Sequence, residues 1–123
     1  MAPEVALNKL YNLSADVYSF GILCWEIFKC EKPYDKMSKS THHKDVVLGN
    51  VRPCTRNLVE DCPKLLINIL EECWSENPLT RPCFDDLARV IQEEAYNLSQ
   101  SKNSTMSRSI LMMQRSLHSL NGM

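Results

Sequence analysis

The chain has 123 residues and a mass of 14.2 kDa, and its sequence is 44% hydrophobic and 24% charged. These proportions are typical of a globular protein, and the length suits one domain. Because 14 Lys and Arg residues oppose 15 Asp and Glu residues, the net charge of -1 offers no bulk attraction for nucleic acid or for an anionic membrane.

The sequence indicates neither a membrane span nor a secretory signal. Residues 17–25 form the longest uncharged stretch, which is too short for a bilayer, and no basic segment and apolar run follow Met1. The six cysteines form no C-x-x-C pair, and the three histidines are not spaced with them as zinc ligands. We therefore expect reduced thiols, no metal site, no membrane insertion, and a cytoplasmic chain or the cytoplasmic side of a membrane-anchored parent.

The first strong helical pattern covers residues 15–29. Ser14 is the predicted N-cap, and Asp16 lies in the first turn, where a carboxylate suits the helix dipole. Ten of the fourteen residues from 15 to 28 are apolar, and they cover every side of the helix. A helix that is apolar all round, yet too short for a membrane, belongs in the middle of a core.

Proline residues separate the elements that follow. A polar loop from Pro33 to His42 precedes a short predicted helix over residues 44–48, and residues 51–61 have an irregular pattern. Pro63 is expected at the first position of an amphipathic helix that ends at Trp74. The apolar stripe of that helix consists of Cys62, Leu65, Leu66, Ile69, Leu70, Cys73 and Trp74.

A last core helix is predicted over residues 82–97, with an apolar side made of Phe84, Leu87, Ala88, Ile91, Ala95 and Leu98. Residues 99–109 are rich in polar residues and indicate a linker. The tail carries apolar residues at alternating steps of four and three, the spacing of a short coiled-coil seam: Met106, Ile110, Met113, Leu117 and Leu120. Since two heptads are marginal in water, we expect a frayed tail, with helix-mediated self-association as the alternative.

Three sequence motifs occur in order between residues 1 and 98. Ala2-Pro3-Glu4 precedes the segment DVYSFGILCWEI that begins at Asp16, and CWSENPLTRPCF follows from Cys73. This order resembles the back half of a eukaryotic protein kinase domain, closest to the tyrosine-kinase-like group and the tyrosine kinases. The resemblance implies an all-α chain, namely part of the helical C-lobe of a two-lobed kinase fold whose complete domain is α+β, with residues 99–123 as a separate tail.

The resemblance implies structural roles for four side chains. In the family, the acid matching Glu4 ends the activation segment and pairs with the arginine matching Arg81, and such pairs can form two parallel hydrogen bonds. The aspartate matching Asp16 accepts backbone hydrogen bonds from the catalytic loop, although a carboxylate at this position could also simply serve the helix dipole. Trp74 is expected in the core.

Other positions match regions that surround the nucleotide and the substrate in the family. Leu23 and Ile27 match the foot of the hydrophobic column under the adenine ring, and without the resemblance both would be assigned to plain core. Met1, Ala2 and Pro3 would border the pocket for the residue after the phosphoacceptor.

The groups that perform phosphoryl transfer in the family lie upstream of A-P-E: a Gly-rich loop, a Lys–Glu pair, an H-R-D-x-x-x-x-N loop and D-F-G. The chain starts at A-P-E, so we expect it to bind neither ATP nor Mg²⁺ and to be inactive alone. A full-length parent would use both to phosphorylate proteins, with protein substrates or the upstream kinase half as partners. The alternative is a non-catalytic interaction or dimerisation module. Without that upstream half, we expect the central helix to expose a large apolar patch.

One motif imitates a catalytic loop. His43-Lys44-Asp45 and Asn50 fit H-(R/K)-D-x-x-x-x-N, which would make Asp45 a base and Asn50 a magnesium ligand. The motif follows the central helix instead of preceding A-P-E, and no D-F-G comes after it. We interpret the match as a coincidence.

Overall fold

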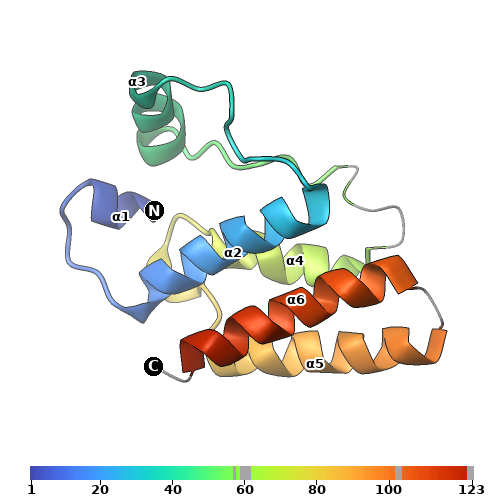
Figure 1. The fold of residues 1–123 in the computed structure, drawn as a ribbon. Coiled ribbons are helices and arrows are strands. Elements are labelled where there is room, and N and C mark those ends of the chain that lie inside the picture. Colours follow the sequence, from blue (N-terminus) through green and yellow to red (C-terminus); the bar gives the residue numbers. More distant parts are fainter. Residues whose placement is uncertain (57, 59–61, 102–103, 122–123) are drawn as a thin grey trace.

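The computed structural model describes residues 1–56, 58, 62–101 and 104–121. All regular elements in these residues are helical, without a strand, which confirms the predicted all-α class for this part of the chain (Figure 1). In order they are α1 (Pro3–Ala6), α2 (Leu13–Lys29), α3 (Lys39–His42), the π-helical segment η1 (His43–Leu48), α4 (Lys64–Cys73), the 3-10 turn η2 (Pro78–Thr80), α5 (Phe84–Ser101) and α6 (Ser104–Asn121).

Helix α2 is the central helix that the all-round apolar pattern predicted, but its N-cap differs from the prediction. Asn12, rather than Ser14, caps it, because Oδ1 of Asn12 accepts a hydrogen bond from the backbone N–H of Ser14 at 2.9 Å. The helix ends at Cys30, which adopts a left-handed conformation and donates its N–H to the carbonyl of Glu26. Asn and Ser are equally good N-caps, so the local sequence could not decide between the two positions.

The core lies between α2, α4, α5 and α6 (Figure 1). Helices α4 and α6 pack on α2, and α5 packs on both α4 and α6. The rings of Phe20 and Phe84 meet edge to face at 6.0 Å, which joins the middle of α2 to the start of α5. The α2 side chains buried in this core are Ala15, Val17, Tyr18, Phe20, Cys24, Trp25 and Phe28.

The predicted stripes of α4 and α5 face this core with one exception. Leu66, Leu70, Leu87 and Ile91 are fully buried. Leu65, which was predicted to belong to the α4 stripe, is instead 48% exposed. Pro63 also stands outside α4, as its N-cap, because its extended backbone ends the preceding loop.

Gly21 marks the closest approach of α2 to α4. A Cβ atom at this position would lie 2.7 Å from the Cβ of Cys73, and both belong to rigid helices. We expect Gly21→Ala to lower the free energy of unfolding by about 1–3 kcal/mol through overpacking, despite the better helix propensity of alanine. A urea titration would measure the loss. Ser19→Ala, on the exposed side of α2, is the control, and equal stability of the two variants would contradict the close packing.

The helical stretch before Leu48 is longer than predicted. Residues up to His42 were expected to form a loop, but α3 begins at Lys39 and continues directly into η1. Ser38 caps α3, since its hydroxyl accepts a hydrogen bond from the N–H of Thr41 at 3.1 Å. No side chain of α3 is buried, so the apolar spacing that would have indicated a helix is missing.

The tail departs most from the prediction of a linker and a frayed end. Helix α5 continues to Ser101, and α6 runs antiparallel to it (Figure 1). Ile110, Met113 and Leu117 are buried against the chain's own core, and Leu120 is partly buried, whereas the side chain of Met106 lies outside the described residues. The tail therefore covers part of the central helix that we expected to be exposed. Among the described residues, no helix combines the length and hydropathy of a membrane span.

Candidate functional site

The structure brings Glu4 and Arg81, which are 77 residues apart, into one buried ion pair. Nη1 of Arg81 donates to Oε1 of Glu4 at 2.6 Å, and Nη2 donates to Oε2 at 3.1 Å. Arg81 also donates from Nε to the carbonyl of Ser75 and from Nη1 to that of Ser14, both at 3.0 Å. One guanidinium thus joins α1, the start of α2 and the loop after α4.

Local sequence places both partners of this pair. Pro3 stands at the start of α1, where its fixed backbone suits the first turn, and Glu4 follows it. On the other side, the side chain of Asn77 accepts a hydrogen bond from the N–H of Leu79 and caps η2, whose last turn delivers Arg81. The short helices α1 and η2 therefore place the carboxylate of Glu4 and the guanidinium of Arg81 within hydrogen-bonding distance of each other.

Burial opposes ionisation of Glu4, but the hydrogen bond and the charge of Arg81 outweigh it, so the pKa of Glu4 is lowered from its ordinary value of 4.5. A lowered pKa stabilises the folded state above 4.5, and this contribution is lost as the pH falls through the folded-state pKa. We expect the difference in unfolding free energy between the wild type and Glu4→Gln to be constant at neutral pH and to shrink below pH 4.5. Urea titrations of both proteins across this range would measure it, and a difference that grows on acidification would contradict the pairing.

The aromatic ring of Tyr18 lies between two guanidinium groups. The Cζ atoms of Arg52 and Arg81 are each 5.1 Å from the ring centroid, a distance at which cation–π attraction operates. The Tyr18 hydroxyl is buried and interacts with the side chain of Tyr34. Burial raises the pKa of Tyr18, and the two positive charges oppose that rise only in part. Tyr18 therefore stays neutral, and its ring contacts both Arg52 and the arginine of the ion pair.

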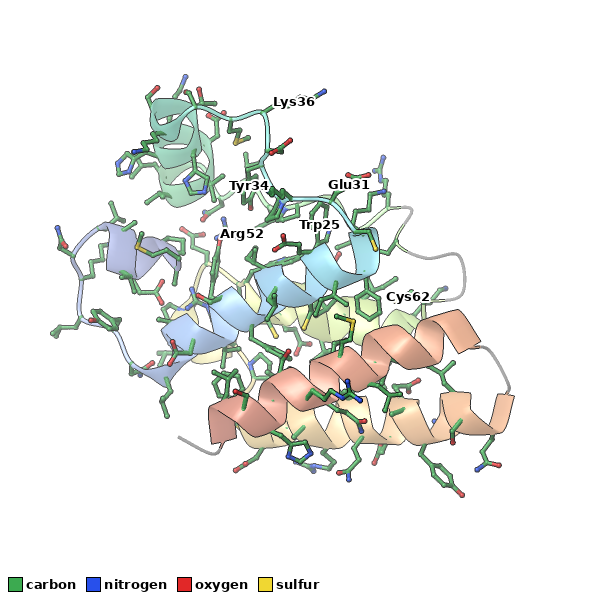
Figure 2. All side chains as sticks on the ribbon, in the orientation of Figure 1. Trp25, Glu31, Tyr34, Lys36, Arg52 and Cys62 are labelled. Carbon is green, nitrogen blue, oxygen red and sulfur yellow. The ribbon has the colours of Figure 1, made fainter. Side chains whose placement is uncertain are left out.

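Arg52 is the structural residue that the sequence analysis missed. Its Nε donates to the carbonyl of Trp74 at 2.9 Å, and its Nη1 donates to the carbonyls of Val46 and Val51 at 3.1 Å. Figure 2 shows its side chain between η1 and α2. The spacing of residues in the sequence carries no signal for contacts to backbone carbonyl groups, because every residue possesses one.

Asp16, Leu23 and Ile27 share one face of α2, as their helical spacing requires. Asp16 is exposed, Leu23 is 42% exposed, and Ile27 is half-buried, so this face is the least covered side of the central helix. Within the described residues, the carboxylate of Asp16 has neither a hydrogen bond nor an ion pair. Asp16 and Arg81 line one open hollow beside the start of α2, but no hydrogen bond or ion pair among the described residues joins Asp16 to the Glu4–Arg81 pair.

An open hollow of about 660 Å³ adjoins this face at the start of α2. Met1, Ala2 and Asp16 line it together with Tyr11 and Leu13. Pro3, the third residue of the predicted pocket border, does not line the hollow and is buried in α1.

The residues that fit H-(R/K)-D-x-x-x-x-N lie in and directly after η1. Asp45 lies within η1, and Oδ1 of Asn50 accepts a hydrogen bond from Nη2 of Arg52 at 3.3 Å. Among the described residues, no group of three or more His, Cys, Asp and Glu side chains could hold a metal ion.

All six cysteines are free, and burial raises the pKa of Cys73 to about 12, so this thiol is unreactive at neutral pH.

Residues 1–91 match the sequence profile of the protein tyrosine and serine/threonine kinases. The chain belongs to the protein kinase family. Its relatives include dual specificity protein kinase shkA of Dictyostelium discoideum, 34% identical over 93 residues, and serine/threonine/tyrosine-protein kinase HT1 of Arabidopsis thaliana, 37% identical over 93 residues. Insulin receptor-related protein of Cavia porcellus is 37% identical over 95 residues.

Each of these alignments covers 76% of the kinase chain but only 17%, 23% and 7%, respectively, of the relative. The chain thus spans less than a quarter of the length of these relatives. The Glu4–Arg81 pair lies wholly within the matched part, whereas α6 lies wholly outside it.

Proposed function

We propose that residues 1–98 are the part of a kinase C-lobe that begins at the A-P-E motif, in a domain of the tyrosine-kinase-like group. The observation that carries this proposal is the bidentate Glu4–Arg81 pair, because it joins the first and last of the three motifs in the buried geometry that the resemblance implies. The group assignment is supported by relatives whose names include dual specificity and serine/threonine/tyrosine kinases.

In this proposal, the parent protein transfers the γ-phosphate of ATP to hydroxyl groups of proteins. Residues 1–98 form the helical part of its kinase domain that supports the catalytic segments. The incompletely covered face of α2, with Asp16, Leu23 and Ile27, would support the segments that hold ATP and Mg²⁺. The described residues themselves have no cluster of metal-ligating side chains. Their contribution is to position other parts of the domain, and phosphoryl transfer depends chiefly on such positioning.

The 123-residue chain alone should therefore incorporate no phosphate. Mixing it with radiolabelled ATP, Mg²⁺ and a general protein substrate should give the background signal of a reaction without enzyme, because its sequence contains neither the Gly-rich loop nor the D-F-G motif that handle ATP and Mg²⁺ in the family. Asp45→Ala is the matched control. Turnover well above background that disappears in Asp45→Ala would contradict the proposal and would make Asp45 a base.

A non-catalytic interaction module is the second candidate function, and one observation favours it. Around the hollow at the start of α2, Met1 and Leu13 are each 73% exposed and Tyr11 is 67% exposed, and clustered exposed apolar side chains mark protein contacts. If the chain is such a module, light scattering should show a defined oligomer that dissociates in Leu13→Asp. A monomer at all concentrations would exclude self-association through this surface. Association through the seam of α6 also stays a proposal, and it requires α6 to leave the core.

A further inference from the structure

Helix α6 packs on both α2 and α5, although it lies beyond residue 91, where the family match ends (Figure 1). Three of its side chains are buried in the shared core: Ile110 and Met113 are 0% exposed, and Leu117 is 3% exposed. Their spacing of three and four residues places them on one side of the helix. A segment outside the matched kinase sequence thus completes the core of the matched part.

We infer that the groove between α2 and α5 is a helix-binding site and that α6 is its ligand within the same molecule. The recognition mode is that of an amphipathic helix in an apolar groove, which uses anchors at positions i, i+3 and i+7. This inference is independent of the proposed kinase function, because it concerns only the contacts of the tail.

The rotation of α6 in the groove is fixed by its own sequence. Leu111 and Met112, which lie between the anchors Ile110 and Met113, are 49% and 53% exposed. Two adjacent methionines therefore have opposite environments, one in the groove and one in solvent. They provide a pair of positions at which the same substitution has different expected effects.

The charges of the two helices are complementary. Helix α5 contains four acidic residues and one arginine, whereas α6 contains two arginines and no acidic residue. The ion pairs found among the described side chains do not join α5 to α6. Charge therefore favours a basic helix as the occupant without holding it by a specific contact, and the apolar anchors supply most of the affinity.

A cleavable chain tests the inference. A specific protease site is inserted between residues 101 and 104, and the complete protein is cut after purification. We expect the released segment of residues 104–123 to co-elute with the body in size-exclusion chromatography at micromolar concentration. A tail that separates at once, whatever state the body adopts, would overturn the inference.

Competition by labelled peptides of residues 104–121 then identifies the bound face. We expect the wild-type and Met112→Asp peptides to displace the cut tail at similar concentrations. The Met113→Asp peptide should need a concentration that is higher by roughly 100-fold or more, because its binding would bury a carboxylate in an apolar groove. Equal competition by the two variant peptides would show that the buried face is not what binds.

Light scattering of the uncut protein decides which molecule supplies the helix. A monomer over the accessible concentration range is expected when α6 fills the groove of its own chain. A dimer whose dissociation requires release of α6 would overturn the intramolecular assignment, because the occupant would then be the tail of a second copy.

Discussion

Arg81→Met is expected to lower the free energy of unfolding by about 3–5 kcal/mol, because it leaves the buried carboxylate of Glu4 without its partner. The substitution also removes the hydrogen bonds that the guanidinium donates to the carbonyls of Ser75 and Ser14. Methionine retains the length of the aliphatic stem, so the loss reports on the charged group rather than on a cavity. Urea titrations of the wild type and Arg81→Met would measure the loss of unfolding free energy, provided that both proteins show the same dependence of that free energy on urea concentration.

The chain offers a matched control for this prediction. Arg89 forms an ion pair with Asp86 one turn away on α5, but the two side chains are 67% and 53% exposed. Arg89→Met should therefore cost only about 0–1 kcal/mol, the range of surface ion pairs. Adding Glu4→Gln to Arg81→Met should cost less than the sum of the two single changes, because both remove the same pair. Equal losses in the two arginine variants would contradict a structural role for Arg81.

Met113→Ala is expected to lower the free energy of unfolding by about 2–5 kcal/mol, because the side chain is fully buried between α6 and the rest of the core. Met112→Ala removes the same atoms from a side chain that is 53% exposed and should change stability by about 0.5 kcal/mol or less. Urea titrations of both variants, monitored by far-ultraviolet circular dichroism, would measure the difference.

The comparison of the two methionines separates a folded tail from a frayed one. If the tail were frayed, both substitutions would act on side chains in solvent, and neither would change the unfolding midpoint. Similar stability of the two variants would therefore contradict the packing of α6 on α2 and α5. A large loss in Met112→Ala alone would indicate that α6 is rotated about its axis.

The parts of the fold that the sequence predicted correctly depend on strong and local signals. The all-round apolar pattern of α2 placed it in the middle of the core, and the helical spacing of Leu66, Leu70, Leu87 and Ile91 identified the buried sides of α4 and α5. The approach of Glu4 to Arg81 could not come from periodicity at all. It came from the resemblance of two separated motifs to one family.

The missed features have physical reasons that can be named. The seam of α6 has the spacing of a coiled coil, which predicts an apolar face but does not say whether that face packs on its own chain or on another. Helix α3 has no buried side chain and therefore no apolar pattern. Arg52 binds backbone carbonyl groups, which every residue possesses, so no sequence spacing identifies its partners.

The central claim is that these residues are the supporting helical part of a larger kinase domain. Its most direct test is to sequence the coding region upstream of Met1 and to measure the mass of the protein in its own cells. We expect an open reading frame that continues upstream and encodes a Gly-rich loop, an H-R-D loop and a D-F-G motif, and a protein much larger than 14.2 kDa. An in-frame stop codon directly before Met1, with a cellular protein of 14.2 kDa, would contradict the claim and favour the interaction module.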